Sequence, residues 1–299
     1  MWLGFALISA ALYGIAEILD NFFANKEFKH PLTLVFYSCL FNLVYVPLLI
    51  LLMHPSLPPL STLPIFILLG FVNVGYLYPY YKGLKDDDTS VAISFLAIER
   101  ILVPVLAFLV IGEVLQPVQY AGILVIVMSV ILLGLHHSRA RFKLSKGVWH
   151  ISCAALFLAC EAILLKVLFD QGVSVETAVT GEAIISLAFG ASVAGLAHVR
   201  RDIVRSFGLF RKLLPIFLIE ELFTLAGLYT ESKAISMAPV SIVKGVTMAS
   251  PFFLVIYAWL GVQFFPKLFK EDLHRRQIFK KLVLFAVLVT GIMLIKGSY

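Results

Sequence analysis

About ten apolar stretches of membrane-spanning length follow one another along the chain, and they limit its fold more than any other feature. The hydrocarbon core of a bilayer is about 30 Å thick, so a crossing helix needs about 20 apolar residues. Backbone polar groups must be satisfied within each crossing segment, which favours α-helices. The sequence therefore predicts an all-α integral membrane protein with ten transmembrane helices. Hydropathy and breaker residues place these helices at 2–24, 31–53, 62–82, 89–111, 117–136, 147–169, 174–197, 212–234, 239–265 and 279–296.

The composition leaves little room for any other kind of domain. Hydrophobic residues make up 61% of the 299 residues, charged residues make up only 14%, and the mean hydropathy is +0.97. Ordinary soluble domains carry about 25% charged residues. The spans alone use about two thirds of the chain, which excludes a soluble catalytic domain. The first apolar run lacks a basic leading segment and carries Glu17 and Asp20, so we expect a retained membrane helix there.

Basic residues are concentrated in every second connection between the predicted helices. Nineteen of the 24 Lys and Arg residues lie in the connections after the first, third, fifth, seventh and ninth helices. Cytoplasmic loops retain positive charge, so these connections are predicted to be cytoplasmic and both termini to lie outside the cytoplasm. The net charge of +6 follows from this orientation. We expect no nucleic-acid partner, because the basic loops are short and contain no interleaved aromatic residues.

Two sets of matching residues indicate that the chain is an internal duplication. Helix 2–24 aligns with helix 147–169, and a second match precedes the last helix of each half. We therefore predict two five-helix repeats, residues 1–138 and 147–299, joined by a basic cytoplasmic connection at 139–146. Five is odd, so the repeats are inverted, as in secondary transporters that alternate access around a midplane cavity. The matches pair Gly4, Ile8, Ser9, Ala11 and Ala16 with Gly147, Ile151, Ser152, Ala154 and Ala159, and Glu113, Leu115 and Gln119 with Glu271, Leu273 and Gln277.

Residues near several span ends resemble the EamA type of the drug/metabolite transporter superfamily. That family often has a Glu-Pro step in its fourth and ninth helices, and Glu99-Arg100 and Ser250-Pro251 each match half of this step. The resemblance implies ten helices in two repeats, a monomer or homodimer in a cell membrane such as the bacterial inner membrane, and transport of a small molecule. The other matching segments are Tyr81-Lys82-Gly83-Leu84 with Thr89-Ser90, Lys233-Ala234-Ile235 with Ala238-Pro239-Val240-Ser241, and Gly112-Glu113.

Charged residues lie inside the predicted spans, where each costs free energy unless it faces a cavity or a partner. Acidic residues exceed basic ones by seven to three. We interpret the excess as the lining of a substrate or proton pathway, although each residue alone is equally consistent with an ion pair. The acidic residues are Glu17, Asp20, Glu99, Glu161, Glu182, Glu220 and Glu221, and the basic residues are Arg100, Lys166 and Lys244.

The first helix carries the best candidate. Tyr13, Glu17 and Asn21 are four residues apart and form one polar stripe with Asp20. The sequence Ala16-Glu17 followed by Lys26 also resembles the small multidrug resistance branch of the same superfamily, which implies a glutamate that exchanges protons for organic cations. Glu161 is nearly the repeat partner of Glu17, so the two could serve opposite gates. Alternatively, Glu161 pairs with Lys166 or Lys244 and holds the bundle together.

Further candidates lie on other helices. Lys244 shares a face with Ser241 and Met248, and either binds an anionic group or neutralises Glu220 or Glu221. Arg100 is not expected to bond Glu99 directly, because helix neighbours point about 100° apart. Asn73, Tyr76 and Tyr80 fall on one face, which is compatible with a cage for a cation, and Tyr80 and Tyr81 fit an interfacial aromatic belt at least as well.

These observations predict a secondary transporter, and more specifically an exporter, of a small polar or cationic metabolite such as an amino acid or amine, coupled to protons or a counter-substrate. The alternatives are an exchanger of anionic metabolites that uses Lys244 and Arg100, or a lipid flippase. An enzyme is not expected, since the chain has no HExxH, GxSxG or GxxxxGK[ST] motif, and no metal or other cofactor is predicted. The candidate site residues are Glu17, Tyr13, Asn21, Glu99, Glu161, Glu182, Glu220, Lys244, Asn73 and Tyr76.

Overall fold

The computed structural model describes residues 1–24, 28, 30–86, 95–137, 146–264 and 275–297. Every regular element in these ranges is a helix, so the all-α prediction is confirmed for them. The α-helices are α1 (Trp2–Phe22), α2 (Pro31–Leu40), α3 (Asn42–Met53), α4 (Leu63–Asp86), α6 (Ile98–Ile111), α7 (Pro117–His137), α8 (Lys146–Asp170), α9 (Val175–Ser192), α10 (Ala197–Met237), α11 (Val240–Thr247), α12 (Ser250–Phe264) and α13 (Arg275–Gly297). Short 3-10 turns occur at Leu60–Thr62 and Val193–Gly195.

Several of these helices are suited to cross a membrane. Seven described segments are long and apolar enough to span a bilayer, and Pro117–Leu133 and Leu282–Gly297 are shorter apolar helices. Large apolar side chains such as Leu51, Leu109 and Trp149 are exposed on the outside of the bundle. Lipid tails are the environment that tolerates such a surface. The chain is therefore a multi-pass membrane protein.

Two predicted helices are each interrupted. The predicted helix 31–53 consists of α2 and α3, because the backbone tightens at Phe41, whose N–H bonds to Ser38 O three residues earlier at 3.2 Å. The predicted helix 239–265 consists of α11 and α12, which meet at Met248 and Ala249. Pro251 is the second residue of α12 and has no N–H to continue the hydrogen-bond ladder of α11. The predicted start of helix 89–111 falls partly outside the described residues.

The predicted boundary of the eighth helix is wrong. The sequence predicts a start at 212, but α10 is continuous from Ala197 to Met237, 41 residues, and includes the predicted connection 198–211. At 1.5 Å per residue this helix is about 60 Å long, twice the thickness of the bilayer core. Its basic first part ends the hydropathy signal without ending the helix, because Arg and Lys are good helix formers.

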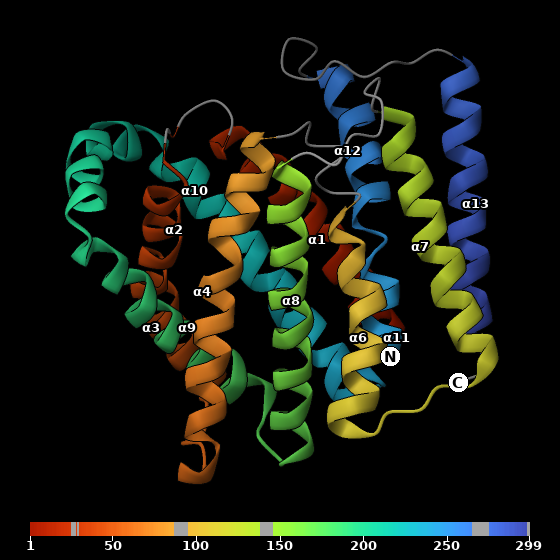
Figure 1. The fold of residues 1–299 in the computed structure, drawn as a ribbon, viewed down its shortest axis with the longest axis horizontal. Coiled ribbons are helices and arrows are strands. Elements are labelled where there is room, and N and C mark those ends of the chain that lie inside the picture. Colours follow the sequence, from red (N-terminus) through yellow and green to blue (C-terminus); the bar gives the residue numbers. More distant parts are fainter. Residues whose placement is uncertain (25–27, 29, 87–94, 138–145, 265–274, 298–299) are drawn as a thin grey trace.

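The helices form one bundle with a regular arrangement of neighbours (Figure 1). The most extensive contacts join α4 to α8, α1 to α10 and α7 to α13. The C-terminal ends of α1, α4, α7 and α12 lie toward one edge in the view of Figure 1, and both chain termini lie toward the opposite edge.

Glycines let two helix pairs approach closely. A Cβ on Gly122 of α7 would lie 2.9 Å from Gly291 O, and a Cβ on Gly291 of α13 would lie 2.9 Å from Gly122 O. On α10, a Cβ at Gly227 would lie 2.8 Å from the ring of Tyr13. Cβ atoms essentially never approach other atoms this closely, so the contacts between α7 and α13 and between α10 and α1 require these glycines.

Candidate functional site

A cavity of about 200 Å³ lies inside the bundle, and the predicted polar residues converge on it. Every α-helix from α1 to α12 in the described part of the chain contributes to its wall. Nine of the ten predicted site residues line it, and the side chain of the tenth, Asn21, lies outside the described part of the chain. The nine are Tyr13, Glu17, Asn73, Tyr76, Glu99, Glu161, Glu182, Glu220 and Lys244. Asp20, Arg100, Glu221 and Glu231 line the same cavity.

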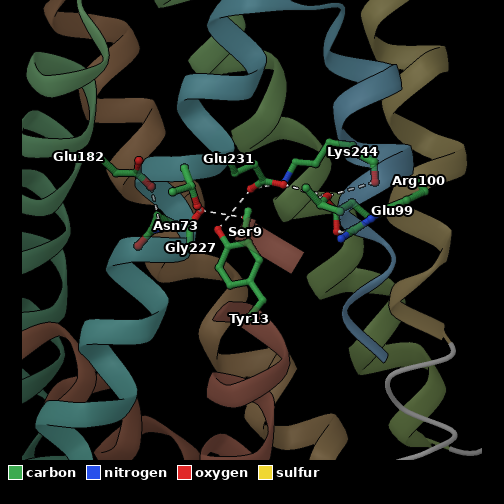
Figure 2. A network of polar contacts seen from close by, with 11 residues as sticks. Ser9, Tyr13, Asn73, Glu99, Arg100, Glu182, Gly227, Glu231 and Lys244 are labelled. Carbon is green, nitrogen blue, oxygen red and sulfur yellow. Dashed lines mark hydrogen bonds and ion pairs between the residues drawn. The ribbon is translucent and has the colours of Figure 1, made fainter. Parts of the chain in front are cut away.

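A buried ionic network fills one part of this cavity (Figure 2). Lys244 Nζ lies 3.0 Å from Glu231 Oε2 and 3.1 Å from Glu99 Oε1. The Tyr13 hydroxyl donates to Glu231 Oε2 at 3.2 Å, and the Thr247 hydroxyl donates to Glu231 Oε1 at 3.1 Å. The side chains of Lys244, Glu99 and Glu231 are at most 6% exposed. Lys244 therefore joins carboxylates from α6 and α10 to its own helix, α11.

Two expectations about partners are wrong. Arg100 and Glu99 do form an ion pair although they are sequence neighbours. Glu99 lies in the first turn of α6, directly after the turn at Ala97, and both side chains are long enough to meet across this helix end.

The second error concerns the lysines. Lys244 pairs with Glu99 and Glu231 rather than with Glu220 or Glu221, and Lys166 pairs with Asp170 one turn away on α8 at 3.0 Å. The physical reason is the position of Lys244 along the neighbouring helix: it lies near the C-terminal end of α10, which carries Glu231. Glu161 has no cation within ion-pair distance among the described residues. The interpretation of Glu161 as a lock between helices is therefore not supported.

Glu231 is the central residue that the sequence analysis missed. It lies in the predicted helix 212–234 but was not counted among the intramembrane charges. A signal for it existed, because Glu220 and Glu231 are eleven residues apart, close to three full helical turns, and so share one face of α10. Both are 2% exposed, and both line the cavity.

The remaining carboxyl groups have neutral partners. Glu17 Oε1 accepts from Ser250 Oγ at 2.9 Å, Glu182 Oε1 accepts from Asn73 Nδ2 at 2.7 Å (Figure 2), and Glu220 Oε1 accepts from Thr224 Oγ1 at 2.9 Å. The Oε2 atoms of Glu17, Glu161, Glu182 and Glu220 are buried without a hydrogen-bond partner. Eight carboxyl groups but only two cations line the cavity in the described part of the chain, so six carboxyl groups are in excess.

Three of the four tyrosines of α4 face the interior, whereas Tyr78 is exposed. Tyr80 and Tyr81 are 5% and 3% exposed, and their hydroxyls donate to Asp20 Oδ2 and Oδ1, each at 3.2 Å. Tyr76 lines the same cavity. The alternative of an interfacial aromatic belt is therefore wrong for Tyr80 and Tyr81. The polar stripe of α1 also faces inward, since Tyr13, Glu17 and Asp20 all line the cavity.

A carboxylate from outside the cavity positions α11. Glu113 follows the left-handed residue Gly112 at the end of α6, and its Oε2 and Oε1 accept the N–H groups of Val240 and Ser241 at 2.8 and 3.1 Å. The first N–H groups of a helix have no partner within it, and a carboxylate there also opposes the helix dipole favourably. Glu113 thereby holds the beginning of the helix that carries Lys244.

Comparisons with known proteins agree with this architecture. A solved structure, titled only as the crystal structure of a protein, has the same fold, with a TM-score of 0.66 and 14% sequence identity over 98% of this chain and 98% of that chain. A search of the curated proteins found no significant match. Residues 1–135 match the family described as the EamA-like transporter family, which lies in the drug/metabolite transporter superfamily. Residues 1–135 of the chain therefore match the EamA-like transporter family, in agreement with the sequence resemblance.

Proposed function

We propose that the protein is a secondary transporter, in the export direction, for a small organic cation such as an amine, and that protons compensate the charge of the empty cavity. The observation that carries this proposal is the excess of six carboxyl groups over cations in the cavity wall. That much negative charge between apolar helices is too costly to remain uncompensated. Protons and a cationic solute can replace one another in this role, which couples their movements.

The alternative of an anion exchanger is less well supported. It requires Lys244 and Arg100 to bind an anionic substrate, but Lys244 faces Glu99 and Glu231, and Arg100 faces Glu99. An anion at these cations would have to displace buried carboxylates and would face the excess of negative charge. No described feature favours a lipid flippase.

An inverted repeat is consistent with how the helices pair. Counting helices within each predicted half, α1 and α8 come first, and α4 and α10 come third. The contacts of α1 with α10 and of α8 with α4 are therefore equivalent, as are those of α12 with α1 and of α6 with α8. The fourth helix of the second half is interrupted at Met248 and Ala249, and α6 begins directly after a turn at Ala97. This supports two related halves around a shared cavity.

The sidedness predicted from the loop charges is part of the proposal. The basic first part of α10 and the ends of α1, α4, α7 and α12 lie toward one edge in Figure 1. By the distribution of Lys and Arg, that edge faces the cytoplasm and both termini face away from it.

Proteoliposomes with an imposed pH gradient test the function. Uptake of amines, amino acids and organic anions is compared for the native protein, Glu17→Gln and Lys244→Ala. We expect uptake of cations that is driven by the gradient and lost in Glu17→Gln. Asp170→Asn is the matched control, because Asp170 is half-exposed at the end of α8 and pairs only with Lys166 in the described structure.

Two results would contradict the proposal. One is cation uptake that is insensitive to the gradient and equal in the native protein and Glu17→Gln. The other is gradient-driven uptake of organic anions that Lys244→Ala abolishes, which would favour the anion exchanger.

A further inference from the structure

Apart from Glu17, the excess carboxyl groups of the cavity divide into two groups, and the first surrounds Asp20. Tyr80 and Tyr81 donate to both oxygens of Asp20, and Ser38 Oγ lies 3.0 Å from the Tyr81 hydroxyl. Glu220 lines the same part of the cavity wall and interacts electrostatically with Asp20 and Glu221. Glu220 is 2% exposed, and its Oε2 is buried without a hydrogen-bond partner.

The second group consists of Glu161 on α8 and Glu182 on α9. Asn73 Nδ2 donates to Glu182 Oε1 at 2.7 Å, and Ser186 Oγ donates to Asn73 Oδ1 at 3.1 Å, which fixes the amide. Glu161 and Glu182 are 5% and 1% exposed, and each has a buried Oε2 atom without a hydrogen-bond partner. Neither has a cation within ion-pair distance among the described residues.

The separation of the two groups follows from the positions of their partners along α4. Asn73, which binds Glu182, and Tyr80, which binds Asp20, both line the cavity and are seven residues apart on α4. At 1.5 Å per residue this corresponds to about 10 Å along the helix. Tyr76 lies between them on the same face, and Leu225 and Leu228 of α10 also line the cavity. The wall between the carboxyl groups is therefore largely apolar and aromatic.

We propose that the cavity takes a linear diamine or polyamine, with one ammonium group at Asp20 and Glu220 and another at Glu161 and Glu182. This inference rests on the proposed function and specifies its substrate class. The methylene chain between two ammonium groups matches the apolar wall, and ammonium groups supply donors to the unpartnered carboxylate oxygens. A monoamine satisfies only one group. An α-amino acid brings its own carboxylate into a cavity that already has an excess of carboxyl groups.

Binding of defined amines to the purified protein tests this proposal. Isothermal titration in detergent compares butylamine, octylamine, putrescine, octane diamine and spermidine. We expect octane diamine and spermidine to bind at least about tenfold more tightly than octylamine, since a second charge-assisted contact contributes this much or more. Putrescine is too short to reach both groups and is expected to bind like butylamine.

Single substitutions then separate the two ends. Glu220→Gln and Glu182→Gln each remove one end, so each lowers the affinity for octane diamine to that for octylamine, while the affinity for octylamine falls by no more than about twofold. Asp170→Asn is the control, because it lies outside the cavity. Thermal unfolding of each variant shows whether it is folded. If a variant does not fold, the binding of diamines of different chain length to the native protein tests whether both groups of carboxylates are used.

The proposal is overturned if octylamine binds the native protein as tightly as octane diamine, or if affinity does not depend on chain length among the diamines. These outcomes leave the proposed function intact when monoamines still move with the pH gradient in proteoliposomes. Loss of all cation transport, by contrast, removes the proposed function itself.

Discussion

Lys244 is 3.0 Å from Glu231 and 3.1 Å from Glu99, so one buried cation holds two carboxylates from different helices. With Arg100 beside Glu99, the network contains two positive and two negative charges and is neutral as a whole. The two carboxylates of this network are neutralised by cations, and in this they differ from the six other carboxyl groups of the cavity. At the scale of single residues, we therefore assign the network to holding the bundle together, and the proposed function assigns protons or a substrate to the excess carboxyl groups.

Removal of Lys244 tests the structural part of this distinction. Lys244→Met leaves Glu231 and Glu99 buried without their shared cation, and we expect the free energy of unfolding to fall by about 3–5 kcal/mol. Thermal unfolding in detergent measures the effect. Lys166→Met is the control, because Asp170, its partner, is half-exposed, and such pairs contribute about 0–1 kcal/mol. Equal losses in the two variants would contradict the assignment.

Glu113 provides a second test at the same scale. Glu113→Ala removes the acceptor of the Val240 and Ser241 N–H groups, and we expect a loss of about 0.5–2 kcal/mol in the free energy of unfolding. Gln116→Ala, in the same connection, is the control, since the hydrogen bonds of Gln116 in the described structure use its backbone N–H and C=O, which alanine keeps. A stability of Glu113→Ala equal to that of the control would argue against the capping role.

At the scale of helices, the close packing of α7 against α13 depends on two glycines that lie opposite one another. Gly122 and Gly291 face one another where α7 meets α13, and each backbone oxygen lies 2.9 Å from the position that a Cβ on the other residue would take. In membranes, where lipid tails are as apolar as leucine, such small residues let helices gain van der Waals contact. The pairing of α7 with α13 therefore rests on these two positions.

Gly291→Ala tests this contact. Its new Cβ would meet Ile126 Cγ1 at 2.7 Å and Gly122 O at 2.9 Å, so we expect a loss of about 1–3 kcal/mol in the free energy of unfolding. Gly297→Ala, on the same helix, meets nothing within 4 Å and is expected to raise stability slightly, because alanine favours helices. Thermal unfolding of both variants measures these changes, which are expected to have opposite signs. A higher stability of Gly291→Ala than of the native protein would contradict the close packing.

At the scale of the whole molecule, the arrangement of connections predicts how the protein lies in the membrane. The connection 112–116 and the basic first part of α10 lie toward opposite edges in Figure 1. If the basic edge is cytoplasmic, a reagent that cannot cross the membrane reaches only the other edge in intact cells.

Cysteine labelling measures this orientation. In a chain whose three native cysteines are replaced, we expect Gln116→Cys to react with an impermeant maleimide from outside intact cells. Gly208→Cys, an exposed position in α10, is expected to react only after the cells are opened. The reverse pattern would invert the proposed topology.

Much of the site could be predicted because burial of charge in a membrane is a strong local signal. Glu17, Asn73 and Tyr76 line the cavity as expected, since a polar side chain on an otherwise apolar helix avoids lipid. The partners could not be predicted. Whether Lys244 pairs with Glu220 or with Glu231 depends on the relative positions of α10 and α11 along their axes. The local sequence of neither helix specifies these relative positions.

The helical membrane fold and the residues that avoid lipid follow from the sequence alone, because the length of an apolar run and the solvation cost of a charge are properties of each segment. The arrangement of the helices in space sets which carboxylates are neutralised, where α10 begins and which helix end Glu113 caps. These depend on contacts between distant segments, such as that of Glu113 with Val240, 127 positions away, whose geometry is set by packing of the whole bundle.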